Sequence, residues 1–245
     1  MKYLPFLFLS ILCASDDNAP ANRTKDRQVD IKHIKINVTV DLKAKSVFGH
    51  VTHTLSPLRS NLSSFILHGD DMKIRRIRMG GKDLKYTHSS NEIHIDLPNP
   101  IGWDETVDVR IDYIANPREG TYFFGPDDTY PNQPWQAWTQ GETEDNHHWV
   151  PLYDYPNERA TFETILTVDQ RFQAVSNGEL LSVEKNKDGT HTWHWKENFP
   201  MVAYLISFVV GEFEKVEDSY KNIPVNYWVY KLSLIHISEP TRPLS

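Results

Sequence analysis

The sequence has a single cysteine, no excess of positive charge and no apolar run long enough to cross a membrane. Because a disulfide needs two cysteines, none can form within the chain. Lysine and arginine number 26 against 33 aspartates and glutamates, and the net charge of −7 argues against a nucleic-acid partner. The first apolar stretch, residues 4–14, is far shorter than the ~20 residues of a transmembrane helix, so we expect no membrane span.

The N-terminus is organised like a secretory signal peptide. Lys2 precedes the apolar run, and the small residues Cys13 and Ser15 suit cleavage after Ser15. We therefore expect residues 1–15 to be a signal peptide, residues 16–28 to be a polar leader, and the protein to be secreted or periplasmic. A lipid anchor at Cys13 is the less favoured alternative, because Leu12 is bulkier than the residue that usually precedes a lipidated cysteine.

Alternating apolar and polar residues dominate the rest of the chain. Residues 34–40 place isoleucine and valine at every second position, as in a strand with one buried face. Further strands are expected at 47–55, 74–79, 92–97, 106–113, 135–139, 161–168, 179–184, 190–195, 203–210 and 225–230, with a long ordered loop at 116–134. No segment of helical length carries an apolar stripe with the helical period. The predicted fold class is therefore all-β, a β-sandwich or a curved antiparallel sheet.

The sequence lacks the common catalytic motifs. It contains no H-E-x-x-H, no G-x-S-x-G elbow and no glycine-rich phosphate loop. The histidine pair His50 and His53 would point to opposite faces of a strand, as would His191 and His194. The pair at 147–148 adjoins an acidic run but has no recognised ligand spacing. From the residues alone we assign no catalytic residue and no metal ligand.

The most distinctive segment is 136–163, which reads QAWTQGETEDNHHWVPLYDYPNERATFE. Its T-Q-G-E run at 139–142, followed by W-V-P-L-Y-D-Y-P at 149–156, resembles the N-terminal domain of zinc peptidases of the aminopeptidase N and leukotriene hydrolase type. The runs A-V-S-N-G-E at 174–179 and P-M-V-A-Y-L-I-S-F at 200–208 resemble neighbouring motifs of that family, in the same order. The resemblance covers about residues 29–230.

This resemblance implies a saddle-shaped all-β domain, here residues 29–231, that packs on a thermolysin-like zinc domain. It also implies that Glu142 binds the free α-ammonium of a peptide substrate and that Gln140 lines the same site. A fixed carboxylate suits this task, because it makes a charge-assisted hydrogen bond and sets the distance to the scissile bond. Leu152, where many relatives have cysteine, is expected to pack. Asp154 and Arg159 are expected to form a structural ion pair.

The family's zinc ligands, in H-E-x-x-H with a downstream glutamate, and its G-x-M-E-N strand do not occur in these 245 residues. Zinc is therefore expected in the intact enzyme and not on this chain. Residues 232–242, LSLIHISEPTR, resemble a translated sequencing adapter, so residues 232–245 are expected to be an adapter-derived tail on a truncated domain. We expect the chain alone to have no aminopeptidase activity.

The alternative is a free-standing β-sandwich that serves as a binding or scaffold module. Its contact surface would use the aromatic residues at 122–124 and 135–138 to meet a sugar or a protein. The same rings would also be exposed if they formed the face that a second domain covers. The second explanation is favoured, so the isolated domain is expected to show an apolar patch beside Glu142 and to associate.

Overall fold

The computed structural model describes residues 26–231, 233 and 234, and its main element is an eight-stranded sheet. The expected signal peptide, most of the expected leader and nearly all of the expected adapter tail lie outside the described residues. The strands of the large sheet, in spatial order, are β13 (Glu179–Lys185), β14 (Thr190–Met201), β11 (Ala160–Asp169), β1 (Val29–Asp41), β2 (Ser46–Pro57), β8 (Val107–Ala115), β4 (Met72–Met79) and β5 (Lys82–Asp83).

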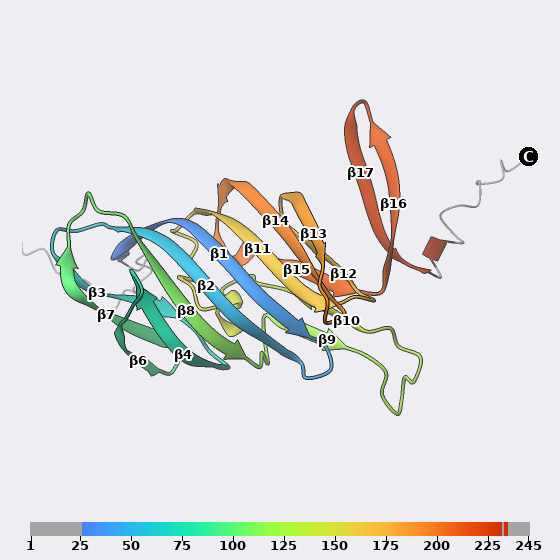
Figure 1. Cartoon of the computed structure of the whole chain (residues 1–245), viewed down its shortest axis with the longest axis horizontal. Helices are drawn as coiled ribbons and strands as arrows, with labels where there is room; N and C mark the ends of the chain where they lie inside the picture. The colour runs from blue at the N-terminus through green and yellow to red at the C-terminus, as the bar shows by residue number, and fades with distance from the viewer. Residues whose placement is uncertain (1–25, 232, 235–245) are drawn as a thin grey trace, which may run out of the picture.

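Three smaller sheets accompany the large one (Figure 1). A three-stranded sheet near the β4 end contains β3 (Leu62–His68), β7 (Glu92–Ile101) and β6 (Lys85–Ser89). A four-stranded sheet near the other end contains β12 (Gln173–Ser176), β15 (Phe208–Gly211), β10 (Gln136–Thr139) and β9 (Thr121–Phe124). The hairpin of β16 (Phe213–Tyr220) and β17 (Ile223–Tyr230) projects from the body. Two 3₁₀ turns, η1 (Asn146–His148) and η2 (Ala203–Leu205), complete the fold.

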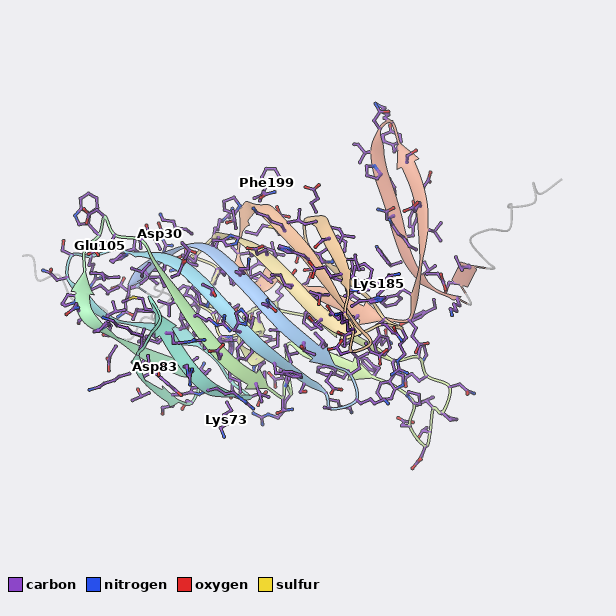
Figure 2. All side chains as sticks on the ribbon, in the orientation of Figure 1. Asp30, Lys73, Asp83, Glu105, Lys185 and Phe199 are labelled. Atoms are coloured by element: carbon purple, nitrogen blue, oxygen red, sulfur yellow. The ribbon has the colours of Figure 1, made fainter. Side chains whose placement is uncertain are left out.

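One continuous core joins the large sheet to the two sheets that pack against it. In β1 every second side chain is buried from Ile34 to Val40, as the alternating pattern predicted. Phe65 of β3 and Phe208 of β15 are both fully buried in the same cluster. Phe199 points outward instead. It lies near the C-terminal end of β14 and is 78% exposed (Figure 2).

The structure confirms the all-β fold class, with three differences in detail. β1 and β11 pair in parallel, whereas the other paired strands of the large sheet are antiparallel, so the sheet is mixed. The predicted strand 203–210 was wrong in its first half, because residues 203–205 form η2 and the strand β15 begins at Phe208. The predicted loop 116–134 also contains the short strand β9. Among the residues described, no helix is long and apolar enough to cross a membrane.

The buried His53 makes the stability of the fold depend on pH. Its side chain is fully buried on the inner face of β2, and Nε2 donates to the Pro151 carbonyl at 2.9 Å. Burial lowers its pKa from 6.5 to about 4, although the bond to Pro151 opposes the shift. The folded protein therefore keeps His53 neutral at a pH where the unfolded chain already binds a proton. The contribution of His53 to the free energy of unfolding is therefore complete above pH 6.5 and is lost as the pH falls through 4.

We predict that His53→Gln flattens this pH dependence. The amide can still donate to Pro151 but cannot take up a proton. Between pH 6.5 and 4 the wild type should lose on the order of 3 kcal/mol of unfolding free energy through His53, and the variant should not show this loss. Urea unfolding at half-unit pH steps measures the difference. His94→Gln, at an exposed histidine, is the control and should follow the wild type. Parallel profiles for wild type and His53→Gln would contradict the prediction.

Candidate functional site

Gln140 and Glu142 lie in the loop that leaves β10, and both side chains are exposed. The backbone between them is fixed on both sides. The N–H of Gln140 donates to the Gly120 carbonyl at 3.0 Å, and the carbonyl of Gly141 accepts from the N–H of Asp145 at 2.9 Å. Gly141 is buried, and a Cβ there would lie only 2.6 Å from the side chain of Asn146. The loop is thus a tight turn that presents two polar side chains to solvent.

Asn146 holds this turn against the body of the domain. Its side chain is fully buried, and Nδ2 donates to the carbonyls of Ala203 at 2.6 Å and Ile206 at 3.0 Å. Its Oδ1 accepts from the indole Nε1 of Trp149 at 2.8 Å. Trp149 is itself fully buried and packs edge to face on Phe208 with ring centroids 5.1 Å apart. One side chain therefore satisfies three buried polar groups around η1 and η2.

The three motif regions identified in the sequence meet in space. Asn177 of the S-N-G turn accepts from the N–H of Ser207 at 2.8 Å and donates to the carbonyl of Leu205 at 3.1 Å. Thr139, next to Gln140, accepts from the N–H of Phe208 at 2.9 Å. The segment 203–208 thus lies between the S-N-G turn and the loop of Gln140 and Glu142. In the sequence these motifs are related only by their order, and in the fold they lie together.

An aromatic stripe lies on β9 and β10 beside this loop. Tyr122 stands opposite Trp138 with ring centroids 4.8 Å apart, and Phe124 stacks on Trp138 at 6.1 Å. Phe124 is 36% exposed, as is Val209 of the neighbouring β15, which pairs with Trp138. Trp138 lies two residues before Gln140, so the stripe adjoins the start of the loop along the chain. Partly exposed apolar side chains are therefore present where the loop begins.

A second polar cluster lies on the other side of η1. Nδ1 of His147 lies 3.0 Å from Oδ2 of Asp154, which also accepts the His147 N–H at 2.9 Å. Burial lowers the pKa of His147, but the hydrogen bond and charge of Asp154 outweigh it, so the pKa is raised. The expected pair of Asp154 and Arg159 was wrong. Arg159 is exposed, while Asp154 is buried against His147.

Asp71 and His148 extend this cluster toward the turn that follows β3. Nδ1 of His148 lies 2.9 Å from Oδ2 of Asp71, whose other oxygen accepts from the guanidinium of Arg118. Burial raises the pKa of Asp71, but hydrogen bonds from Arg118 and His148 outweigh it and lower the pKa. One ring nitrogen each of His147 and His148 and a carboxylate oxygen of Asp70 lie within 4.8 Å of one another. Sequence reasoning assigned no metal ligands here, because Asp70 is distant in the chain.

Leu152 packs as expected and also joins two parts of the domain. Its side chain is fully buried, and its backbone exchanges two hydrogen bonds with His68 at the end of β3, of 2.7 and 3.0 Å. The segment 146–154 therefore connects the three-stranded sheet to the four-stranded sheet. Sequence reasoning missed the central residue of this segment, Asn146. Its one available signal was an amide three residues before a tryptophan, between an aspartate and a histidine pair.

Comparison with known proteins identifies the family. Residues 30–205 match the Peptidase M1 N-terminal domain, and the chain belongs to this family. The match confirms the resemblance to aminopeptidase N and leukotriene hydrolase type peptidases. Leukotriene A-4 hydrolase from Xenopus laevis is 24% identical over 206 residues, which cover 80% of this chain and 34% of that protein.

Two further relatives show the range of the family. Transcription initiation factor TFIID subunit 2 from Danio rerio is 24% identical over 250 residues, covering 81% of this chain and 21% of that protein. The fold is also that of an M1 zinc metallopeptidase from Deinococcus radiodurans, solved as a mutant bound to a Tyr-Ser-Ala substrate. That structure has a TM-score of 0.69, 20% identity and coverage of 82% of this chain and 47% of that one. The chain thus spans less than half the length of each of these relatives.

The residues of this chain do not fit the zinc site of the family. Its zinc ligands lie in H-E-x-x-H, which occurs nowhere in the 245 residues. The nearest alternative, the group of Asp70, His147 and His148, has neither that spacing nor a helix to carry it. No catalytic step through zinc is therefore assigned to this chain.

We predict that Asn146→Ala destabilises the domain by roughly 3 kcal/mol or more. The change leaves the Ile206 carbonyl and the Trp149 indole N–H buried without a partner, and each such group costs about 1–3 kcal/mol, while the Ala203 carbonyl keeps the Ile206 N–H. Urea unfolding measures the loss, and hydrogen exchange of residues 140–145 should speed up in the same variant. Asn132→Ala, in an exposed loop, is the control and should change the stability by no more than about 0.5 kcal/mol. Equal stabilities of the two variants would contradict the assigned role of Asn146.

Proposed function

We propose that this domain is the substrate-anchoring part of a zinc-dependent aminopeptidase, an enzyme that removes N-terminal residues from peptides. The observation that carries the proposal is the loop 140–145. It presents Gln140 and Glu142 to solvent from a backbone that Asn146 and Gly120 hold in place. A family whose members include zinc metallopeptidases has this fold, and the T-Q-G-E motif falls in this loop.

The chemistry of the proposed anchor follows from the two side chains. A peptide amino terminus is a compact cation with three N–H donors, and the Glu142 carboxylate accepts two of them or shares one between its oxygens. Gln140, two residues away, contributes an amide oxygen as a further acceptor. Because the loop is tied to the body of the domain, the carboxylate has a fixed place, and the bound amine fixes the position of the first peptide bond.

The reaction itself needs groups that this chain does not contain. In the family zinc polarises the scissile carbonyl and activates water, and the zinc comes with H-E-x-x-H. Within the proposal, this chain binds and orients the amine, and its aromatic stripe of Tyr122, Phe124 and Trp138 packs against the domain that holds the zinc. We also propose that the enzyme works outside the cytoplasm, because segment 1–15 has the organisation of a signal peptide.

A scaffold role is the second candidate, and one comparison favours it. The TFIID subunit 2 relatives are named as subunits of a transcription initiation factor, so proteins with this domain are not all named as peptidases. In that role the aromatic stripe and the exposed hairpin residues Tyr220 and Ile223 would contact a protein partner. The two candidates differ in one respect that can be tested, since only the anchor needs the charge of Glu142.

We predict that Glu142→Gln lowers kcat/KM about 100-fold in the enzyme that carries this domain. The change keeps the size of the side chain but removes its charge, and a charged hydrogen bond that matters in the transition state contributes about 3 kcal/mol. Hydrolysis of aminoacyl fluorogenic substrates measures the effect. Glu144→Gln, on the same loop, is the matched control and should retain wild-type activity.

The 245-residue chain alone provides the complementary control. It is expected to hydrolyse no aminoacyl substrate, with or without added zinc, because it lacks H-E-x-x-H. Hydrolysis by the purified chain would contradict the proposal. So would an enzyme in which Glu142→Gln and Glu144→Gln are equally active.

A further inference from the structure

The cluster around η1 is arranged like a metal site in which carboxylates orient the histidines. His147 and His148 each engage a carboxylate through Nδ1, with Asp154 at 3.0 Å and with Asp71 at 2.9 Å. Histidine ligands of metals commonly donate one ring N–H to a carboxylate, which fixes the ring and leaves the other nitrogen for the metal. Two adjacent histidines share the carboxylate contact here. Their rings lie side by side, with centroids 4.5 Å apart and planes inclined by 31°.

A carboxylate completes the group of donor atoms. An oxygen of Asp70 and one nitrogen from each histidine lie within 4.8 Å of one another, so a small side-chain movement would bring all three onto one ion. Glu119 lies on the open side, with Oε2 3.7 Å from Nε2 of His148, and its side chain is exposed. It can therefore move onto the ion as a fourth ligand. Two imidazoles with one or two carboxylates form a donor set that suits Zn²⁺, Co²⁺ or Ni²⁺ better than Ca²⁺ or Mg²⁺.

The backbone holds these donors in place without an ion. The N–H of Asp70 donates to the carbonyl of His147 at 2.9 Å, which joins the β3–β4 turn directly to η1. The neighbouring Asp71 binds both Arg118 and His148. These contacts restrain most of the donors, so less conformational entropy is lost when an ion enters.

The charges of the cluster also favour a cation. Arg118 offsets one negative charge, and Oδ1 of the buried Asp154 has no hydrogen-bond partner among the described residues. Such a buried, half-satisfied carboxylate is costly unless positive charge lies close by. The carboxylates of the cluster belong to Asp70, Asp71, Glu119, Asp145 and Asp154.

We propose that His147, His148 and Asp70 bind one divalent transition-metal ion, with Glu119 as the fourth ligand and with Asp154 and Asp71 orienting the two imidazoles. The ion would join the β3–β4 turn to η1 and thereby stiffen the segment that ends the loop of Gln140 and Glu142. This site depends only on residues of this chain, so it stands or falls independently of the proposed peptidase role.

Titration of the tag-free 245-residue chain with Zn²⁺ and Co²⁺ at pH 8 tests the site. We expect one equivalent to bind by calorimetry, visible absorption from the Co²⁺ complex, and a rise in the melting temperature with added Zn²⁺. Asp70→Asn and His148→Gln should each weaken binding at least tenfold. Asp71→Asn, which removes only an orienting carboxylate, should weaken it roughly 10- to 100-fold.

His194→Gln is the matched control, because His194 also bonds a carboxylate, that of Glu163, outside the cluster. It should bind zinc as the wild type does. Circular dichroism of each metal-free variant shows whether it folds, and Asp70, half-buried in a turn, gives a variant that is expected to fold. Absence of stoichiometric binding would overturn the proposal. So would unchanged affinity in folded Asp70→Asn and His148→Gln.

Discussion

The arrangement of the candidate site depends on the buried side chain of Asn146. Its amide binds the carbonyls of Ala203 and Ile206, and its oxygen accepts from the indole of Trp149. These bonds join η1 to η2 across the core and supply partners that the short turns do not provide for the Ile206 carbonyl and the Trp149 indole. The loop of Gln140 and Glu142 packs on the same amide through Gly141. Without this contact the loop would lose its fixed position on the domain.

The segment that contains Asn146 has two faces with different chemistry. On one side it supports the exposed side chains of Gln140 and Glu142, the acceptors of the proposed amine anchor. On the other side it gathers His147, His148 and the aspartates of the β3–β4 turn into a buried polar network. The two faces share one short piece of backbone, so any group that stiffens the network also stiffens the anchor. Rigid support of this kind is what precise substrate placement demands.

Much of the fold and part of the site could be predicted from the sequence. Alternation located β1, β2, β8, β11 and β14, because each buries one face. It failed for β16, whose residues are largely exposed and whose pattern carries little burial signal, and for η2, where apolar residues fill the core without forming a strand. Local motifs predicted Gln140 and Glu142 as site residues, and the structure places both on one exposed loop. Pairings such as Asp154 with His147, and the nearness of Asp70 to both histidines, arise from tertiary contacts that spacing does not encode.

In the proposed role this β domain positions peptide amino termini for a zinc centre encoded by the same gene. Sequencing of the source locus beyond the codon for Tyr230 distinguishes this role from the scaffold role. We expect the reading frame to diverge from the present tail and to continue into H-E-x-x-H with a downstream glutamate. A frame that ends with a stop codon after Ser245, or one that continues without these ligands, would contradict the proposed role and favour the scaffold role.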